Sequence, residues 1–290
     1  MEAYLKERSL DLAPKTLSNH DQNLSQFVDF LQAQGWETLS QVEAPQMASY
    51  QRYLELQLSP NSLSESLRIL RSWLAWAYDK GHVFSDWSEF SLPQRQALKT
   101  NILSREEVTL LLEQPDLSHP RGFRDFLILE SCYSLALRRS ELHALSITHL
   151  NLKHQELRVM GKGSYERLLP LSPRLCQLFH DYLQRVRPSF EPDSKEIALW
   201  LSSRGGHRLN SHWIAQIITS YGQKASLTIR PHSLRYACAT HLAEAGVPLR
   251  QLQKFLGHRY LESTRQYAQI GKKSLNHEYQ RCHPRAQKLN

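Results

Sequence analysis

Two short apolar segments, 157–160 and 168–171, constrain the fold most, because they flank the turn sequence Gly-Lys-Gly-Ser-Tyr. Apolar segments on either side of a glycine-containing turn predict a β-hairpin, with Lys162 near its tip. Residues 197–201 predict one further short strand. The remaining segments show helical periodicity and no internal repeat. We therefore expect a mainly α fold with a small β-sheet.

The first 90 residues carry apolar side chains at helical spacing. One such stripe follows Pro14, a second covers residues 47–56, and a third covers residues 63–78. Asn61 or Ser62 is the expected N-cap of the helix that carries the third stripe. Stripes of this kind face a protein core far more often than a ligand. This part of the chain therefore predicts a small helical bundle.

Residues 91–102 lack apolar periodicity and carry two basic residues and no acidic ones, which predicts a linker. The N-terminal domain is thus expected to span residues 1–90, and a second domain residues 103–290. A capping box from Ser104 to Glu107 predicts the first helix of this second domain. Further helices are expected over residues 121–134, 138–147, 173–186, from 211 onward, 232–245 and 248–256, with Gly246 and Gly257 ending the last two.

The charge of the chain is unevenly distributed. Residues 1–90 hold 7 Lys and Arg against 12 Asp and Glu, a net charge of −5, whereas the other 200 residues hold 29 against 16, a net charge of +13. DNA is a suitable partner for the basic part, because side chains that neutralise phosphates release counterions. A merely basic soluble protein is the alternative that charge alone leaves open.

Cysteine usage and hydropathy limit the class of protein further. Cys132, Cys176, Cys238 and Cys282 are scattered without a Cys-x-x-Cys pair, so neither a disulfide framework nor a zinc site is expected. The N-terminus has no apolar signal core, and no apolar run is long enough to span a bilayer. These features predict a cytoplasmic protein without membrane contact.

A set of five basic side chains and one tyrosine is the candidate active site. The residues are Arg138, Lys162, His232, Arg235, His258 and Tyr267. Guanidinium groups are planar, always charged and bidentate, so Arg138 and Arg235 can hold the non-bridging oxygens of a phosphodiester. The phenol of Tyr267 can act as a nucleophile once its proton, with a pKa of about 10, is removed. The set indicates DNA strand exchange through a phosphotyrosine intermediate.

Each of these residues alone also fits an ordinary structural role. Lys162 can be a turn lysine in solvent, His232 a hydrogen-bonded core histidine, His258 a helix cap and Tyr267 a core aromatic. Their order and spacing favour the catalytic interpretation. Lys162 follows Arg138 by 24 residues, and Tyr267 follows His258 by 9.

In this order and spacing the residues resemble the tyrosine recombinase, or λ-integrase, family, and most closely the bacterial Xer recombinases of the XerC-like type. The resemblance covers nearly the whole chain and is strongest over residues 126–269. It implies a SAM-like core-binding bundle that clamps DNA, followed by an α+β catalytic domain. It also implies that His232 transfers protons, that Lys162 protonates the leaving 5′ oxygen and that His258 hydrogen-bonds the phosphate.

The resemblance further implies partners and a biological role. The expected partners are double-stranded DNA with a partly palindromic recombination site, a XerD-like subunit within a recombinase tetramer, and a DNA translocase at the division septum. The implied role is the resolution of chromosome dimers during cell division. The C-terminal tail, around residues 274–281, is expected to dock into a neighbouring subunit. No metal and no cofactor are expected, because the phosphotyrosyl ester conserves the energy for religation.

Three positions depart from the family pattern. The family usually has Gly where this chain has Ala136, an apolar residue where it has Arg139, and His where it has Tyr236. All six candidate catalytic positions are nevertheless filled.

The acidic N-terminal domain is a further departure from the family. A domain with net negative charge has to focus its DNA contact in one patch. Arg68, Arg71 and Lys80, which the pattern places on one helix, are the candidate DNA-binding residues of this domain.

Alternative functions remain open at this stage. An integrase of a phage or mobile element would carry the same catalytic residues. A non-catalytic DNA-binding relative is disfavoured by the complete set of six residues. A type IB topoisomerase, which uses similar chemistry, is disfavoured by the N-terminal bundle and the Xer-like tail.

Overall fold

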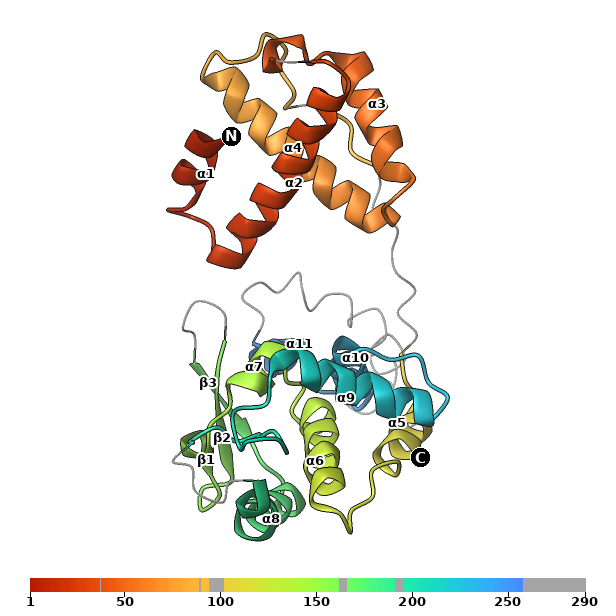
Figure 1. The fold of residues 1–290 in the computed structure, drawn as a ribbon. Coiled ribbons are helices and arrows are strands. Elements are labelled where there is room, and N and C mark those ends of the chain that lie inside the picture. Colours follow the sequence, from red (N-terminus) through yellow and green to blue (C-terminus); the bar gives the residue numbers. More distant parts are fainter. Residues whose placement is uncertain (37, 89, 94–101, 162–165, 191–195, 258–290) are drawn as a thin grey trace, which may run out of the picture. The chain divides into compact units, whose positions relative to one another are not determined.

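The computed structural model describes residues 1–36, 38–88, 90–93, 102–161, 166–190 and 196–257. The chain divides into two compact units, Met1–Lys99 and Thr100–Asn290, and each has its own hydrophobic core (Figure 1). Most of the predicted linker, residues 94–101, lies outside the described residues. The predicted fold class is confirmed, because both units are mainly helical and the second contains a small sheet. In the described ranges, no helix is long and apolar enough to cross a bilayer.

The first unit is a helical bundle, as predicted. Its helices are α1 (Glu2–Arg8), α2 (Pro14–Ala33), α3 (Ala44–Glu55) and α4 (Pro60–Asp79), with a short 3-10 turn at Leu39–Gln41. The apolar stripes of α2, α3 and α4 meet in one core. There the ring centre of Phe27 lies 4.8 Å from that of Tyr50 and 6.2 Å from that of Trp73. Helix α1 has no counterpart in the sequence predictions, and its Tyr4 is fully buried in the same core.

Helix α4 begins earlier than predicted. Its N-cap is Ser59, whose Oγ accepts a hydrogen bond from the backbone N–H of Ser62 at 3.4 Å. The predicted cap at Asn61 or Ser62 is therefore wrong. Pro60 explains the difference, because proline lacks an N–H and has a fixed φ that suits the first helical position.

Among the residues that the structure describes, the sheet of the second unit has three short antiparallel strands in the order β1-β2-β3. They are β1 (Leu150–Asn151), β2 (Glu156–Met160) and β3 (Glu166–Pro170). Strands β2 and β3 form the predicted hairpin, with Met160 paired to Glu166 next to the connecting turn. Residues 162–165 of the connecting turn lie outside the described residues.

The strand predicted over residues 197–201 is wrong. The segment forms only two isolated bridges, between Ser146 and Ala198 and between Leu201 and Arg208. Side chains bind the carbonyl groups that a neighbouring strand would need. The Tyr182 hydroxyl donates to the carbonyl of Leu199 at 2.9 Å, and guanidinium groups donate to those of Ala198 and Leu201. These bonds hold the segment in the core without extending the sheet.

In the described part of the second unit, the helices are α5 (Arg105–Leu112), α6 (Pro120–Ser134), α7 (Arg139–Ala144), α8 (Pro173–Asp181), α9 (Ser211–Lys224), α10 (Pro231–Glu244) and α11 (Leu249–Leu256). The predicted capping box is present, with hydrogen bonds of 2.7 and 3.1 Å between Ser104 and Glu107. The helix predicted over 138–147 ends at Ala144, because Leu145 is extended and its carbonyl accepts from the backbone of Leu199. The helix after Ser172 continues beyond α8 as a π turn (Tyr182–Val186) and a 3-10 turn (Arg187–Phe190).

Helix α6 passes through the centre of the second unit (Figure 1). Its consecutive residues Leu127, Ile128 and Leu129 are all fully buried, so the rest of the unit encloses this part of the helix. Helices α7 and α10 both pack against α6. This central helix therefore fixes the relative positions of the two helices that begin near Arg138 and Arg235.

Candidate active site

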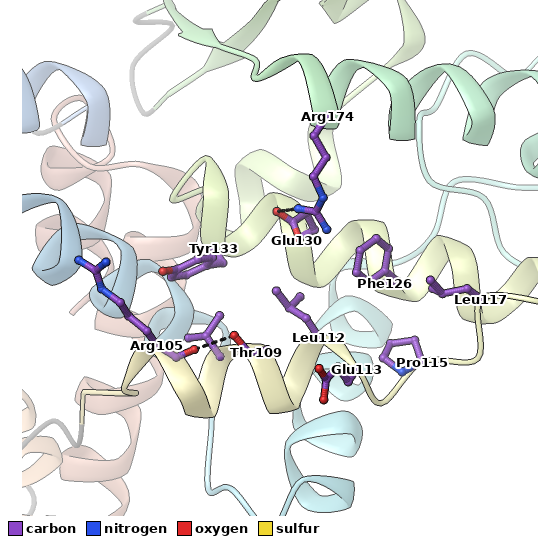
Figure 2. A pocket seen from close by; sticks show the side chains of 11 residues that line it. Arg105, Thr109, Leu112, Glu113, Pro115, Leu117, Phe126, Glu130, Tyr133 and Arg174 are labelled. Atoms are coloured by element: carbon purple, nitrogen blue, oxygen red, sulfur yellow. Dashed lines mark hydrogen bonds and ion pairs between the residues drawn. The ribbon is translucent and has the colours of Figure 1, made fainter.

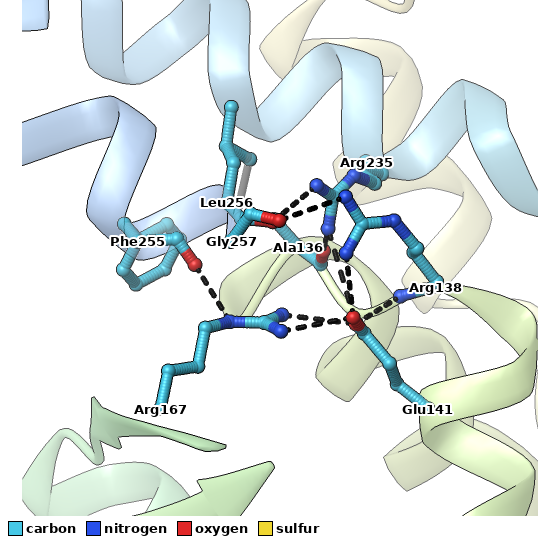
Figure 3. Close-up of polar contacts among 8 residues, drawn as sticks. All are labelled: Ala136, Arg138, Glu141, Arg167, Arg235, Phe255, Leu256 and Gly257. Atoms are coloured by element: carbon cyan, nitrogen blue, oxygen red, sulfur yellow. Dashed lines mark hydrogen bonds and ion pairs between the residues drawn. The ribbon is translucent and has the colours of Figure 1, made fainter. Parts of the chain in front are cut away.

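Three of the six predicted catalytic residues lie in the described part of the chain, at the starts of two helices. Arg138 immediately precedes α7, and His232 and Arg235 are the second and fifth residues of α10. The fold brings the two arginines, 97 residues apart in sequence, to one carboxylate (Figure 3). The other three predicted residues, Lys162, His258 and Tyr267, lie outside the described residues.

Glu141 on α7 is the centre of this polar cluster. Its carboxylate accepts from the side chain of Arg138 at 2.6 Å and from the backbone N–H of the same residue at 2.8 Å. Arg167 on β3 donates to both carboxylate oxygens, at 2.8 and 2.9 Å. Arg235 lies 4.0 Å from the same carboxylate. Three guanidinium groups thus surround one buried acid.

The charges of this cluster favour the binding of an anion. Burial alone would raise the pKa of Glu141, but the hydrogen bonds and charge of Arg167, and then those of Arg138, outweigh burial and lower this pKa to about 2. Glu141 is therefore ionised at neutral pH. Three guanidinium charges and one carboxylate charge leave an excess of two positive charges, which suits a phosphodiester anion.

The arginines also bind the C-terminal end of α11. The last carbonyl groups of a helix have no partner within the helix. Here the carbonyl of Phe255 accepts from Arg167 at 3.0 Å, that of Gly257 from Arg138 at 3.2 Å, and that of Leu256 from Arg235. The cluster therefore holds the helix end that leads directly to the next residue in the chain, His258.

Ala136 forms the turn between α6 and α7. It is fully buried, has a positive φ of 48°, and its carbonyl accepts a hydrogen bond from Arg235. Glycine adopts positive φ without the steric cost that a Cβ atom brings. Glycine, which the resembled family usually has at this position, suits this backbone conformation. Ala136 adopts the same positive φ at the cost of some backbone strain.

His232 lies on the exposed side of the first turn of α10. Desolvation of the ring, followed by the positive charges of Arg235, Arg138 and Arg139, lowers the pKa of His232 below its ordinary value of 6.5. The imidazole is therefore neutral at physiological pH. A neutral imidazole beside a phosphate site can accept a proton, as proton transfer from a nucleophile requires.

The predicted DNA-binding cations of the first unit have partners within that unit. Arg68 forms an ion pair of 2.5 Å with Glu65, one helical turn away on α4. Arg71 donates to the carbonyl of Phe90 at 3.3 Å, and Lys80, which caps α4, lies 3.7 Å from Glu7. Arg68 and Lys80 are exposed, so water weakens both ion pairs and either cation can exchange its partner.

A separate groove of about 620 Å³ lies between α5 and α6 (Figure 2). Its apolar lining includes Val108, Leu112 and Phe126. At its rim, Arg174 lies 3.3 Å from the buried carboxylate of Glu130. None of the predicted catalytic residues that the structure describes lines this groove, so the candidate active site is the arginine cluster.

Comparison with known proteins identifies the family. The model of the phage integrase family matches residues 101–274, and that of the phage integrase SAM-like domain matches residues 1–91. The chain belongs to the tyrosine recombinases. Its relatives include a tyrosine recombinase XerC from Pelobacter propionicus, 34% identical over 97% of this chain and 93% of that protein. A tyrosine recombinase XerD from Staphylococcus epidermidis is 30% identical over 95% and 94%.

Solved structures agree with this tyrosine recombinase fold. A λ integrase dimer bound to a COC′ core site has a TM-score of 0.72, at 16% identity over 92% of this chain and 93% of that one. The XerH recombinase in a post-cleavage complex with a palindromic difH substrate has a TM-score of 0.73, at 18% identity over 96% and 83%. At these identities the structures support the fold alone.

The sequence predictions missed Glu141 and Arg167. Glu141 stands three residues after Arg138, the spacing at which a side chain on the first helical turn reaches back to the residue before the helix. Arg167 occupies a position of β3 that faces the core, between the exposed residues Glu166 and Leu168. A charged residue at a core-facing position of a strand was the available signal that it has a buried partner.

Proposed function

We propose that this tyrosine recombinase cuts and rejoins DNA at a specific site through a 3′-phosphotyrosine intermediate. In this proposal Arg138 and Arg235 bind the scissile phosphate and Tyr267 attacks it. The observation that carries the proposal is the excess of two positive charges around Glu141, next to a histidine whose pKa is lowered. Electrostatic stabilisation of this kind is the main requirement for breaking a phosphodiester.

The remaining proposed roles concern protons and the phosphate. His232 accepts or returns the proton of the Tyr267 phenol, Lys162 protonates the departing 5′ oxygen, and His258 hydrogen-bonds the phosphate. Because the tyrosyl ester conserves the energy of the phosphodiester, religation requires neither a metal ion nor a cofactor. Attack by the hydroxyl that departed then restores the DNA strand and frees the tyrosine.

We further propose that the protein resolves chromosome dimers in the cytoplasm during cell division. The proposed assembly is a tetramer on two DNA duplexes with partly palindromic sites, formed with a XerD-like subunit and activated by a DNA translocase at the division septum. The names XerC and XerD of relatives at 30–35% identity over nearly the whole chain support this role. The C-terminal tail, around residues 274–281, is proposed to couple neighbouring subunits.

The first unit is proposed to complete the grip on DNA through Arg68, Arg71 and Lys80. On binding, these cations would exchange their present partners for phosphates. Losing a contact between a cation and a phosphate lowers affinity and makes binding less sensitive to salt. An integrase of a phage or mobile element has the same catalytic set, but no observation favours it over the role that the Xer relatives support.

Trapping of a covalent adduct tests the proposed chemistry. The substrate is a duplex with a nick near the cleavage point, so that cleavage releases a short fragment and religation fails. We expect the wild-type protein to form an adduct that survives on a denaturing gel. Tyr267→Phe should bind the duplex with unchanged affinity and form no adduct, because it lacks only the attacking oxygen. A Phe variant that is trapped as well as the wild type would assign the nucleophile to another residue.

A recombination assay tests the proposed partnership. The substrate is a plasmid with two copies of a partly palindromic site from near the replication terminus of the same chromosome. We expect recombination only when the XerD-like protein of that organism is added. Efficient recombination by this chain alone would favour an integrase that acts without a second recombinase.

A further inference from the structure

We propose that Arg167 is a positioning residue that links the β2–β3 hairpin to Glu141 and to the C-terminal end of α11. Its task is to set the position of this helix end relative to the Arg138 and Arg235 guanidinium groups. The functional part of this inference rests on the proposed recombinase activity.

The contacts of Arg167 reach two separate elements. Its Nη1 and Nη2 donate to the two oxygens of Glu141 on α7, at 2.8 and 2.9 Å. Its Nε donates to the carbonyl of Phe255 on α11 at 3.0 Å (Figure 3). Arg167 is only 8% exposed, so water does not weaken these bonds. Only a guanidinium group has the geometry to bind a carboxylate with both Nη atoms and still donate from Nε.

Gly257 shows how closely the helix end lies against Arg167. A Cβ atom at this position would lie 2.8 Å from Nη1 of Arg167, a distance that is too short for two non-bonded atoms. Gly257 also has a positive φ of 61°, as the left-handed residue that ends a helix commonly has. A side chain at this position would therefore displace Arg167 from the contacts that it makes here.

The position of Arg167 in the sequence connects these contacts with the proposed catalytic residues. It follows Lys162, the proposed general acid, by five residues, and Gly257, the C-cap of its partner helix, immediately precedes His258. A displacement of the hairpin by DNA would move Arg167, and through it both Glu141 and the end of α11. Because packed elements move as rigid bodies, this connection adjusts the hairpin and the phosphate-binding residues together.

Two substitutions of Arg167 and one matched control test the inference. Arg167→Met removes the three hydrogen bonds but keeps an unbranched side chain, and Arg167→Lys keeps the charge but not the planar fork. The control is Arg187→Met, because Arg187 is also 8% exposed and donates to backbone carbonyls, those of Glu196 and Ala198, away from the cluster. Amide hydrogen exchange over residues 249–257 reports the helix end without requiring activity.

We expect exchange over residues 249–257 to accelerate roughly tenfold in both Arg167 variants, as the loss of an ordinary hydrogen bond implies, and to stay unchanged in Arg187→Met. Single-turnover cleavage of the nicked duplex at saturating protein should fall about 10²-fold in both Arg167 variants, because a small misplacement near the reacting atoms has that effect. Arg167→Lys, which keeps the charge, should leave DNA affinity unchanged. If Arg167→Met does not fold, Arg167→Lys carries the test.

The inference would be overturned if the amides of residues 249–257 exchanged at the wild-type rate in Arg167→Met. If the Met variant does not fold, the same result in Arg167→Lys would overturn it. If Arg167→Lys showed the wild-type rates of both exchange and cleavage, the role of the planar guanidinium group would be overturned, because the charge alone would then suffice. A wild-type protein that forms no adduct would refute the proposed recombinase activity instead, and hydrogen exchange would still decide whether Arg167 positions α11.

Discussion

Arg138 donates a hydrogen bond from Nη2 to the carbonyl of Gly257 at 3.2 Å, across 119 residues of sequence. The guanidinium group proposed to bind the scissile phosphate is thus bonded to the residue that precedes His258. The Arg138 side chain is 30% exposed, whereas those of Arg167 and Arg235 are each 6% exposed. A phosphate that binds Nη2 shares this nitrogen with the Gly257 carbonyl, so DNA binding and the position of the helix end are linked.

Loss of either proposed phosphate-binding arginine should reduce cleavage. We expect Arg138→Ala and Arg235→Ala to lower the single-turnover cleavage rate by about 10²–10³-fold, with a smaller loss of DNA affinity. Arg235→Ala should also lower the free energy of unfolding by about 1–3 kcal/mol, because it leaves the buried carbonyls of Ala136 and Leu256 without this donor. Cleavage assays at saturating protein and urea denaturation measure the two effects. A cleavage loss that weaker DNA binding explains completely would contradict a role in the transition state.

Glu141→Gln should destabilise the protein in a pH-dependent way. The pKa of Glu141 is about 2 in the folded protein and ordinarily 4.5, so the carboxylate stabilises the fold fully above pH 4.5 and loses this effect as the pH falls toward 2. We expect the variant to lose about 3–5 kcal/mol of unfolding free energy at neutral pH, because it breaks a buried ion pair. The difference from wild type should shrink as the pH falls through this range.

Urea denaturation at several pH values measures this effect. The matched control is Glu113→Gln, because Glu113 is an exposed carboxylate at the end of α5. We expect the control to change the unfolding free energy by less than about 0.5 kcal/mol. A loss in Glu141→Gln that does not vary with pH would show that the Glu141 charge is not the source of the stabilisation.

Arg139→Leu should shift the pH dependence of cleavage. If neutral His232 accepts a proton, cleavage falls as the pH drops through the His232 pKa, which lies below 6.5. Removal of the Arg139 charge makes protonation of His232 easier and raises this pKa, so the acidic limb of the rate profile should move to higher pH. Single-turnover rates at saturating protein give the profile, and Arg204→Leu, in an exposed loop, is the control. Arg139 is the smallest of the three arginine effects on this pKa, so the expected shift is small, and an unchanged midpoint in Arg139→Leu would argue against His232 as the titrating group.

Ala136→Gly should leave stability nearly unchanged. Relief of the positive φ gains about 1–2 kcal/mol. This gain offsets the loss of one buried methyl group, about 0.8 kcal/mol, and the extra backbone entropy of glycine, about 0.5–1 kcal/mol. The control is Ala237→Gly, inside α10 and equally buried, which incurs both losses without the gain. Urea denaturation should separate the two variants, and equal losses would show that Ala136 is not strained.

Much of the fold was predictable because local chemistry decides it. The capping box at Ser104 and the hairpin pairing of residues 157–160 with their partner strand depend on residues close together in sequence. The predictions failed where a distant side chain competed for the backbone. Residues 197–201 have the composition of a strand, but Tyr182 and two arginines bind their carbonyl groups.

By itself, the sequence determined the family, the helical periodicities, the hairpin and the identity of the candidate catalytic residues, because these depend on residue type and spacing. Only the tertiary structure decided that Glu141 and Arg167 join Arg138 and Arg235 in one cluster. Burial removes water as a hydrogen-bonding partner, so a buried acid and three arginines must satisfy one another and the carbonyls at the end of α11. These residues lie between positions 138 and 257. For residues so far apart in the sequence, the number of residues between them does not indicate the distance between their side chains.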